Sequence, residues 1–438
     1  MKILLRKFRI IDAAGGFFGS VIVDNGIINE IFNDGGNNFP DADIVVDGSQ
    51  FEASAVLMPA FIDMHAHFRD PGFPEKETLE SASLAAAAGG FGTVVCMANT
   101  LPVTDSIDKA AAIKNRSDSL GLIDLYPVLS LTKNMEGLEL SGIKDLASKG
   151  SSGCTGLPLM LSEDGRDIAD DGLFLAAMAE AKRLGVPVSC HCDFGGADAE
   201  ASKKAGNARA AWSRIEENYA VRRVIELGKK AGCRIHIAHV STAEAAGMIR
   251  EEKSKPAANG FSLSCEATPH HFGATEDDAL FMGDESCGRV NPPLRSEGDR
   301  RALVAAARDG TIDAVATDHA PHSGNDKAAG APGFTGLETA FAASVTYLAD
   351  NVTADMQLIS RLMSGNPAQI LGLNDRGRIA QGMRADLVIA DTAAKRKVNP
   401  EQWRSRGKCS PFNGKALRGK ILMTLNAGKF VFDGRGNV

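Results

Sequence analysis

Histidine is the residue type with the clearest chemical potential in this sequence. The chain has nine histidines, and eight of them stand at or just beyond the end of a short apolar run. Neutral imidazole is a common metal ligand and can carry protons near neutral pH. An isolated histidine is more often a packed structural residue, so it is the clustering that predicts a metal site. The nine are His65, His67, His191, His236, His239, His270, His271, His319 and His322.

The strongest local motif is His65-Ala66-His67, which closes an apolar run and is followed by Arg69. Side chains two positions apart on a strand project to the same side, so both imidazoles can reach one metal ion. The planar guanidinium of Arg69 is suited to binding both oxygens of a carboxylate. The alternative for Arg69 is a structural salt bridge.

Further candidate ligands close other apolar runs. His191 ends VPVSCH, His239 ends RIHIAH, and Asp318 stands at the tip of IDAVATD. A carboxylate at such a tip can bind a metal and also accept a proton from an attacking water, so Asp318 is the candidate catalytic base. Strand alternation predicts that His236 and His319 face away from these ligands, and we interpret both as packed or surface residues.

A site with two metals needs a bridging anion. The run GLPLMLSEDG offers no lysine but does offer Glu163 and Asp164. Asp164, in the turn before Gly165, is the candidate bridge. Cys190 and Cys192 flank His191 and should point away from it, which argues against a Cys-His-Cys metal site.

These residues need a scaffold that brings distant strand ends together. Runs rich in Val, Ile and Leu alternate with longer helical stretches, which is typical of βα units around a parallel sheet. Eight such runs predict an α/β fold with a (β/α)8 TIM barrel, in which active sites form at the carboxyl ends of the strands. The first connecting helix is expected to begin at Pro74. The predicted strands cover 60–68, 92–98, 123–131, 156–161, 186–191, 234–240, 262–267 and 312–317.

Both ends of the chain have a different texture, with short alternating runs separated by glycine-rich turns. We expect residues 1–55 and 375–438 to form one composite β-sandwich domain. Residues 56–374 would then form the barrel domain that carries the metal site.

Composition excludes several classes of protein. The chain has 438 residues, 44% of them hydrophobic, and a formal charge of −7 with scattered basic residues, so nucleic acid is not an expected partner. The amino terminus lacks a signal-peptide core, and the uncharged run 81–104 is better explained as a helix and a strand than as a membrane span. We therefore predict a cytoplasmic protein, in which the eight cysteines are reduced.

Taken together, the motifs resemble the class I bacterial dihydroorotases of the amidohydrolase superfamily. The matching segments include MPAFIDMHAHFRDPG, the SEDG turn, VSCHCD, EATPHHF, RVNPPLR, ATDHAPH and GRIAQGMRADLVIAD, and they extend over nearly the whole chain. This resemblance implies a zinc-dependent enzyme of pyrimidine (UMP) biosynthesis. It would interconvert N-carbamoyl-L-aspartate and L-dihydroorotate.

The resemblance also implies a role for each residue. One zinc ion would be held by His65, His67 and Asp318, a second by His191 and His239, and Asp164 would bridge the two. Arg69, Asn99 and His322 would contact the substrate carboxylate, and Asn291 and the Pro332-Gly333 loop would contact its ring. His67 is also expected to touch the substrate. The chain departs from the family pattern at Glu163, Ala98 and Asp70, and we expect Glu163 to point away from the metals.

Two alternatives stay open. The chain could be another cyclic amidase of the dihydropyrimidinase or allantoinase type, although such relatives usually bridge their metals with a carboxylated lysine. It could also be a non-catalytic scaffold for aspartate transcarbamoylase, although such members have lost ligands that are present here. The resemblance suggests a homodimer, and an active enzyme could still bind aspartate transcarbamoylase.

Overall fold

The computed structural model describes residues 1–33, 39–146, 158–192, 208–256, 259–280, 287–350 and 355–435. Seven of the eight runs predicted to form barrel strands contain a strand, and the fourth, 156–161, shares only Leu161 with its strand. These strands form two parallel groups, one with the order β6-β7-β8 and one with the order β13-β12-β11-β10-β9. The strands are β6 (Phe61–Ala66), β7 (Phe91–Cys96), β8 (Asp124–Pro127), β9 (Leu161–Ser162), β10 (Val188–Cys190), β11 (Arg234–Ile237), β12 (Ser262–Ala267) and β13 (Ala314–Val315).

Contacts just beyond the strand ends join the two groups into a closed barrel. Leu129, after β8, forms a parallel bridge with Leu161 of β9, and Ala66 of β6 forms one with His319, after β13. The Asp318 N–H also donates to the carbonyl oxygen of His65. Closure therefore brings the carboxyl ends of β6 and β13, which are about 250 residues apart in sequence, into direct contact.

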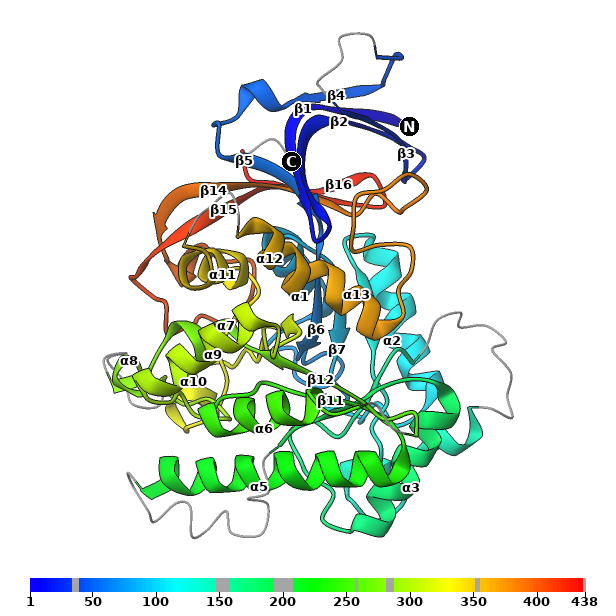
Figure 1. Cartoon of the computed structure of the whole chain (residues 1–438), viewed down its shortest axis with the longest axis vertical. Helices are drawn as coiled ribbons and strands as arrows, with labels where there is room; N and C mark the ends of the chain where they lie inside the picture. The colour runs from blue at the N-terminus through cyan, green and yellow to red at the C-terminus, as the bar shows by residue number, and fades with distance from the viewer. Residues whose placement is uncertain are drawn as a thin grey trace.

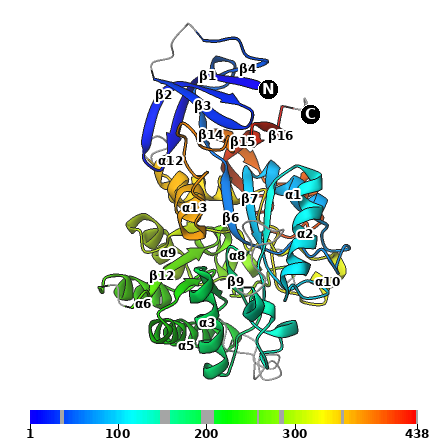
Figure 2. The same ribbon diagram turned by 90° about the vertical axis from the view of Figure 1, so that its right-hand side faces the viewer.

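Helices cover the outside of the barrel, as Figures 1 and 2 show. The helix after β6 begins at Leu79 rather than at Pro74, because Thr78 accepts the Ser81 N–H as its N-cap and the Ser81 side chain returns a bond to Thr78. The helices are α1 (Leu79–Ala88), α2 (Ile107–Leu120), α3 (Asp171–Leu184), α5 (Ala208–Ala231), α6 (Ala243–Lys253), α7 (Pro269–Gly273), α8 (Glu276–Leu280), α9 (Glu297–Asp309), α10 (Gly324–Ala328), α11 (Ala340–Leu348), α12 (Met356–Ser360) and α13 (Asn366–Leu371).

The two ends of the chain share one eight-stranded sheet at the top of Figure 1. Its order is β16-β15-β14-β5-β1-β2-β3, with β4 also paired to β1. Residues from both ends of this order, such as Val21 of β2 and Leu425 of β15, belong to one buried apolar cluster, so the sheet folds over its own core as a sandwich. The strands are β1 (Lys2–Asp12), β2 (Gly15–Asp24), β3 (Ile27–Asn33), β4 (Ile44–Asp47), β5 (Ala55–Pro59), β14 (Leu387–Lys397), β15 (Ala416–Asn426) and β16 (Lys429–Asp433).

The cysteines and the apolar helices of the described residues bear on two predictions, reduced thiols and the absence of a membrane span. The seven cysteines in this part of the chain form no disulfide, and five of them are buried. Cys190 and Cys192 belong to the large apolar cluster between strands and helices, on the side of β10 away from the histidines. In the same part of the chain, no helix combines the length and the apolar character needed to span a bilayer.

Candidate metal centre and substrate rim

The six predicted metal ligands meet at the carboxyl end of the barrel. His65 ends β6 and His67 follows it, while Asp164, His191, His239 and Asp318 follow β9, β10, β11 and β13. All six side chains are buried. Ligand atoms of His65, His67 and Asp318 lie within 4.8 Å of one another, as do those of His65, Asp164 and His239. Five of the six groups thus form two overlapping clusters that share His65. The sixth, His191, lies beside the second cluster, with its Nδ1 2.8 Å from His239 Nε2.

Asp164 stands between the histidines. Its Oδ1 lies 3.3 Å from His65 Nε2, 3.3 Å from His191 Nδ1 and 3.6 Å from His239 Nε2. Its Oδ2 faces the other cluster, 3.3 Å from His67 Nε2. Burial alone would raise the pKa of this carboxyl, but the His65 charge and the other histidine rings that face it hold the pKa well below its usual value. Each oxygen of Asp164 therefore faces a different cluster.

Asp318 lies close to both histidines of the His65-Ala66-His67 motif. Its Oδ1 is 3.1 Å from His67 Nε2 and 3.6 Å from His65 Nε2. Burial opposes ionisation, but the His67 hydrogen bond and the neighbouring imidazoles lower the pKa of Asp318. The group is a carboxylate fixed beside both ligand clusters.

Two neighbouring side chains orient the HxH histidines. His65 Nδ1 lies 2.9 Å from Glu266 Oε1, and His67 Nδ1 lies 2.9 Å from Asn99 Oδ1. When Nδ1–H donates to an oxygen, the Nε2 lone pair is left free for a metal. Asn99, which was expected to contact substrate, therefore contacts a candidate ligand in this structure.

Glu266 is a functional residue that the sequence analysis missed. It lies on β12, is fully buried, and also accepts from His236 Nε2 at 3.0 Å. Burial acts against its ionisation, but the two histidines lower the pKa of Glu266 to about 2. The available signal was an acidic residue near the end of the predicted strand SLSCEA.

The expectation that His236 faces away from the ligands is wrong. His236 and His65 contact the same Glu266 carboxylate, so His236 lies beneath the site. The prediction assumed that side chains alternate from His236 to His239 as they do along a strand. However, β11 ends at Ile237, and His239 has a left-handed backbone with φ of 34°, so the alternation does not extend to His239. His319 does face away, and its Nε2 lies 3.3 Å from the buried Glu77 carboxylate.

The donor set fits divalent metal ions. His65 Nε2 and Asp164 Oδ1 are buried and have no hydrogen-bond partner among the described residues. His191 Nδ1 and His239 Nε2 lie only 2.8 Å apart, so two ring nitrogens converge on one place. Buried polar atoms are normally paired, and imidazole with carboxylate is a common donor set for zinc and similar ions. A cation between these atoms would satisfy them.

Three site residues have backbone conformations that are rare for residues other than glycine. The φ angles of Arg69, His239 and Asp318 are 59°, 34° and 44°. Left-handed backbone costs free energy in such residues and tends to cluster at functional sites. At these three residues, which follow strand ends, the left-handed backbone changes the direction of the side chain, so it no longer follows the alternation of side chains along a strand.

Arg69 and His322 form a rim beside the metal centre. Arg69 Nη2 lies 3.3 Å from His322 Nε2, and Arg69 Nε donates to the Pro321 carbonyl oxygen at 3.3 Å. Arg69 makes no ion pair with any residue in the described ranges. Its burial lowers the pKa of the guanidinium, while Asp318 and Asp164 act in the other direction. A partly desolvated cation without a carboxylate partner therefore stands next to the two metal clusters.

The predicted Pro332-Gly333 loop lies on the same rim. The Pro332 carbonyl oxygen is 3.0 Å from His322 Nε2, and Lys327 Nζ donates to the Gly333 carbonyl oxygen at 3.0 Å. Gly333 has φ of 141°, and a Cβ there would lie 2.6 Å from the Ala320 carbonyl oxygen, so only glycine fits. On the other side of the site, Asn291 Nδ2 lies 3.3 Å from His191 Nε2.

Glu163 points away from the candidate bridge, as expected. Its Oε2 accepts the Leu131 and Thr132 N–H groups at 2.9 and 3.0 Å, and its other oxygen accepts the Thr132 hydroxyl. Glu163 therefore fixes the loop after β8, while its neighbour Asp164 faces the histidines.

The sequence of the chain is similar to a known family of metal-dependent hydrolases and to curated relatives within it. The profile described as "Amidohydrolase family" matches residues 56–431. A dihydroorotase from Clostridium botulinum is 36% identical over 432 residues, which cover 99% of this chain and all of the relative. A dihydroorotase from Clostridium acetobutylicum is 40% identical over 86% of this chain and 88% of the relative.

Among solved structures, similarity extends to hydantoinases. An L-hydantoinase (dihydropyrimidinase) from Arthrobacter aurescens has a TM-score of 0.84 and 25% identity, covering 98% of this chain and 96% of that one. A dihydropyrimidinase from Brevibacillus agri has a TM-score of 0.82 at 21% identity, covering 99% and 96% of the two chains. The second likeness concerns the fold alone.

Proposed function

The chain belongs to the amidohydrolase family and, within it, to the dihydroorotases, and we propose that it interconverts N-carbamoyl-L-aspartate and L-dihydroorotate for pyrimidine (UMP) biosynthesis. In the hydrolytic direction a ring C–N amide bond breaks and a C–O bond to water forms. The proton lost by water ends on the ring nitrogen. Ring closure is the reverse.

The observation that carries the proposed substrate is the Arg69–His322 rim. Dihydroorotate has a carboxylate that dihydrouracil and hydantoin lack, and an arginine fork binds a carboxylate through two parallel hydrogen bonds. Arg69 lies beside the metal centre without an ion-pair partner among the described residues. His322 Nδ1 is a second buried atom on this rim with no hydrogen-bond partner in that part of the chain. The Arg69 guanidinium is suited to an anion entering from solvent, and His322 lies beside it.

We propose two zinc ions per chain. His65, His67 and Asp318 would hold one, His191 and His239 the other, and Asp164 would bridge them. Bound zinc would lower the pKa of water and polarise the amide carbonyl. The assignment is supported by the grouping of these side chains and by two of their atoms, His65 Nε2 and Asp164 Oδ1, which are buried without a hydrogen-bond partner among the described residues.

The chain's own residues then orient the substrate and move the proton. Arg69, Asn99 and His322 are proposed to hold the substrate carboxylate, with Asn291 and the Pro332-Gly333 loop against the ring. His67 is proposed both to hold a zinc ion and to touch the substrate. Asp318 would accept the proton of the attacking water at a carboxylate oxygen and return it to the departing ring nitrogen.

A second candidate is hydrolysis of a neutral cyclic amide, as the name of the Arthrobacter aurescens hydantoinase indicates for that protein. Such substrates have no carboxylate to pair with Arg69, so the rim favours dihydroorotate. A purely scaffolding role is less well supported, because all six ligand side chains are present, five of them in the two metal-ligand clusters and His191 beside Asp164 and His239.

The setting of the enzyme is also a proposal. The unbonded described cysteines are those expected in the reducing cytoplasm, where we place the protein. We further propose a homodimer, with aspartate transcarbamoylase as a candidate partner. The proposed division into residues 56–374 and residues 1–55 with 375–438 is supported by the sheet shared by both ends, although β5 begins at Ala55 and also joins that sheet.

The test is a substrate panel on one zinc-loaded preparation of the whole chain. Initial rates are measured for L-dihydroorotate, dihydrouracil, hydantoin and allantoin at equal concentrations. We expect L-dihydroorotate to be preferred by about 100-fold, because a desolvated guanidinium loses a charge-assisted partner with the other substrates. Faster turnover of a neutral ring would favour the second candidate. No turnover at all would favour the scaffold.

A further inference from the structure

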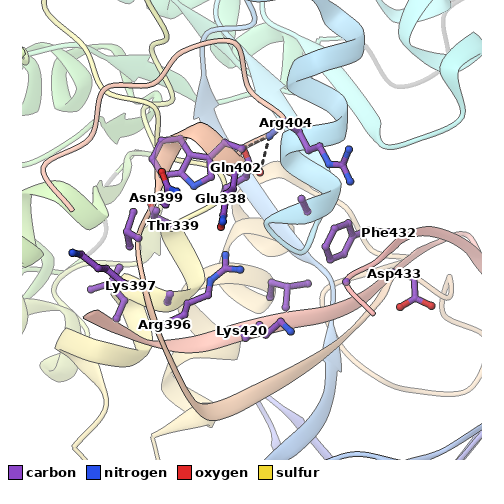
Figure 3. A pocket seen from close by; sticks show the side chains of 17 residues that line it. Glu338, Thr339, Arg396, Lys397, Asn399, Gln402, Arg404, Lys420, Phe432 and Asp433 are labelled. Carbon is purple, nitrogen blue, oxygen red and sulfur yellow. Dashed lines mark hydrogen bonds between the residues drawn. The ribbon is translucent and has the colours of Figure 1, made fainter. Parts of the chain in front are cut away.

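A second cavity, distinct from the metal centre, lies where the terminal sheet meets the barrel. It has a volume of about 260 Å³. Its walls come from β14, β15 and β16, from Ala88 at the end of α1, from residues 338–342 and from the segment 398–404. In Figure 3, Arg396 and Lys420 extend from the strands, and Glu338 lies on the opposite wall. A cavity of this size is suited to a small ligand.

Unpaired cations gather around the second cavity. Four of its lining residues are basic: Arg396, Lys397, Arg404 and Lys420. None of the four side chains forms an ion pair with a residue in the described ranges. Arg396 and Lys420 come from neighbouring strands, because β14 and β15 are paired along their length. Their positive charge is therefore available to a ligand.

The two acidic residues at the second cavity are already occupied. Asp433 pairs with Arg435 at 2.7 Å. The Glu338 carboxylate accepts the backbone N–H groups of Arg404, at 3.0 Å to each oxygen, and of Ser405 at 3.2 Å. Burial raises the pKa of Glu338 to about 7, although these bonds lower it, so its negative charge is incomplete near neutral pH. The balance of charge at the cavity favours an anion.

The chain leads directly from this cavity to the substrate rim. Glu338 is five residues from Gly333, on the same continuous segment. The intervening Thr335 donates its N–H to the Cys409 carbonyl oxygen at 2.8 Å, so residues 404–409 run beside residues 334–338. Arg404, in the wall of the cavity, is therefore hydrogen-bonded to the segment that continues from the Pro332-Gly333 loop.

We propose that the second cavity binds a small phosphate-bearing anion, and that its occupancy changes substrate affinity through the loop 332–338. Arginine forks and lysine ammonium groups are the side chains that recognise phosphate oxygens. The ligand is either free phosphate or a phosphate monoester. The part concerning substrate affinity depends on the proposed function, whereas the binding part does not.

Trp403 provides a local probe of binding. It lines the second cavity, and the chain has only one other tryptophan, Trp212. In a Trp212→Phe background, fluorescence therefore reports on Trp403 alone. Inorganic phosphate and glycerol 3-phosphate are titrated separately at constant ionic strength, which is held with NaCl because exposed charges are screened by salt.

The expected result is a saturable fluorescence change whose apparent affinity falls at least tenfold when Arg396→Gln and Lys420→Gln are combined. Arg222→Gln combined with Lys230→Gln, a charge-matched control on the exposed surface of α5, should leave the affinity unchanged. If inorganic phosphate gives a saturable change, the free ion is sufficient for binding. If only glycerol 3-phosphate does so, the ligand is a phosphate monoester. No saturable change, or equal affinity in the double variant, overturns the site.

Competition at Arg69 must be separated from binding at the second cavity. If Arg69→Gln rather than the double variant abolishes the fluorescence change, the anion binds at the substrate rim and the proposal is wrong. With binding established, a saturating concentration of whichever anion binds, inorganic phosphate or glycerol 3-phosphate, should change KM for L-dihydroorotate at least twofold in the parent and not in the double variant. An unchanged KM in the parent overturns the coupling.

Discussion

The metal-facing half of the site and its rim obtain their side chains from different kinds of structure. The six candidate ligands lie at strand ends and are all buried. Arg69, His322, Pro332 and Gly333 lie on loops, and their contacts are mostly with backbone carbonyl groups or with one another. Barrel closure fixes the first group, whereas loop conformation fixes the second. We expect substitutions in the first half to affect metal binding and chemistry, and substitutions in the rim to affect substrate affinity and choice.

The largest effect is expected for Asp318→Asn. This change keeps the shape of the side chain but removes the proton acceptor and one candidate ligand, so turnover of L-dihydroorotate should fall about 10³-fold or more. Asp277→Asn, at an exposed position on α8, is the matched control and should be active. Substantial activity in Asp318→Asn protein would assign the base to another residue.

The adjacent pair Asp164 and Glu163 separates metal binding from loop support. Asp164→Asn should lower bound zinc from about two ions per chain toward one, because its oxygens face both clusters. Glu163→Gln should keep the zinc but reduce the free energy of unfolding by about 1–3 kcal/mol, since it weakens buried bonds to the loop after β8. Metal analysis and denaturant unfolding of both variants test this. Reversed results would make Glu163 the bridge.

Arg69→Gln tests the rim. The loss of a charge-assisted carboxylate contact should reduce kcat/KM for L-dihydroorotate about 100-fold, with zinc content unchanged. Hydrolysis of dihydrouracil, which lacks the carboxylate, should change little, so the preference between the two substrates should narrow. Parallel losses for both substrates would mean that Arg69 supports the fold or the metals instead.

Asn99 lies at the boundary between the two halves, and its substitution gives the smallest expected effect. In the structure its amide oxygen is 2.9 Å from His67 Nδ1. If orienting His67 is its main role, Asn99→Ala should weaken zinc binding about 10- to 100-fold. If its main role is in substrate binding, KM should rise with zinc affinity unchanged. Measuring both in one preparation assigns Asn99 to one half.

The sequence was most informative where regular structure decides the outcome. The eight parallel strands and the terminal sheet follow from strand periodicity, and the meeting of the six candidate ligands follows from the rule that barrel sites form at the carboxyl ends of strands. His65 and His67 are the clearest example, because two residues on one strand must project together. Glu163 and Asp164 face different ways as predicted, although both lie just after the end of β9 at Ser162.

The sequence was least informative where regular structure ends. His236 was placed on the wrong side because the backbone at His239 adopts left-handed φ. Glu266 was missed because one acidic residue in a strand does not reveal which histidines it will contact. The start of α1 depended on the local capping pair Thr78 and Ser81 rather than on the preceding proline. The second cavity was not predicted, because it forms only where strands from the carboxyl end of the chain pack against the barrel, and no sequence motif marks that contact.

The most direct test of the metal centre is a zinc titration of metal-free protein, followed by L-dihydroorotate hydrolysis in the same samples. The account predicts that activity rises with added zinc and stops rising at about two ions per chain, as expected for a two-metal site. A plateau at one ion per chain, or activity without any bound divalent metal, would contradict it.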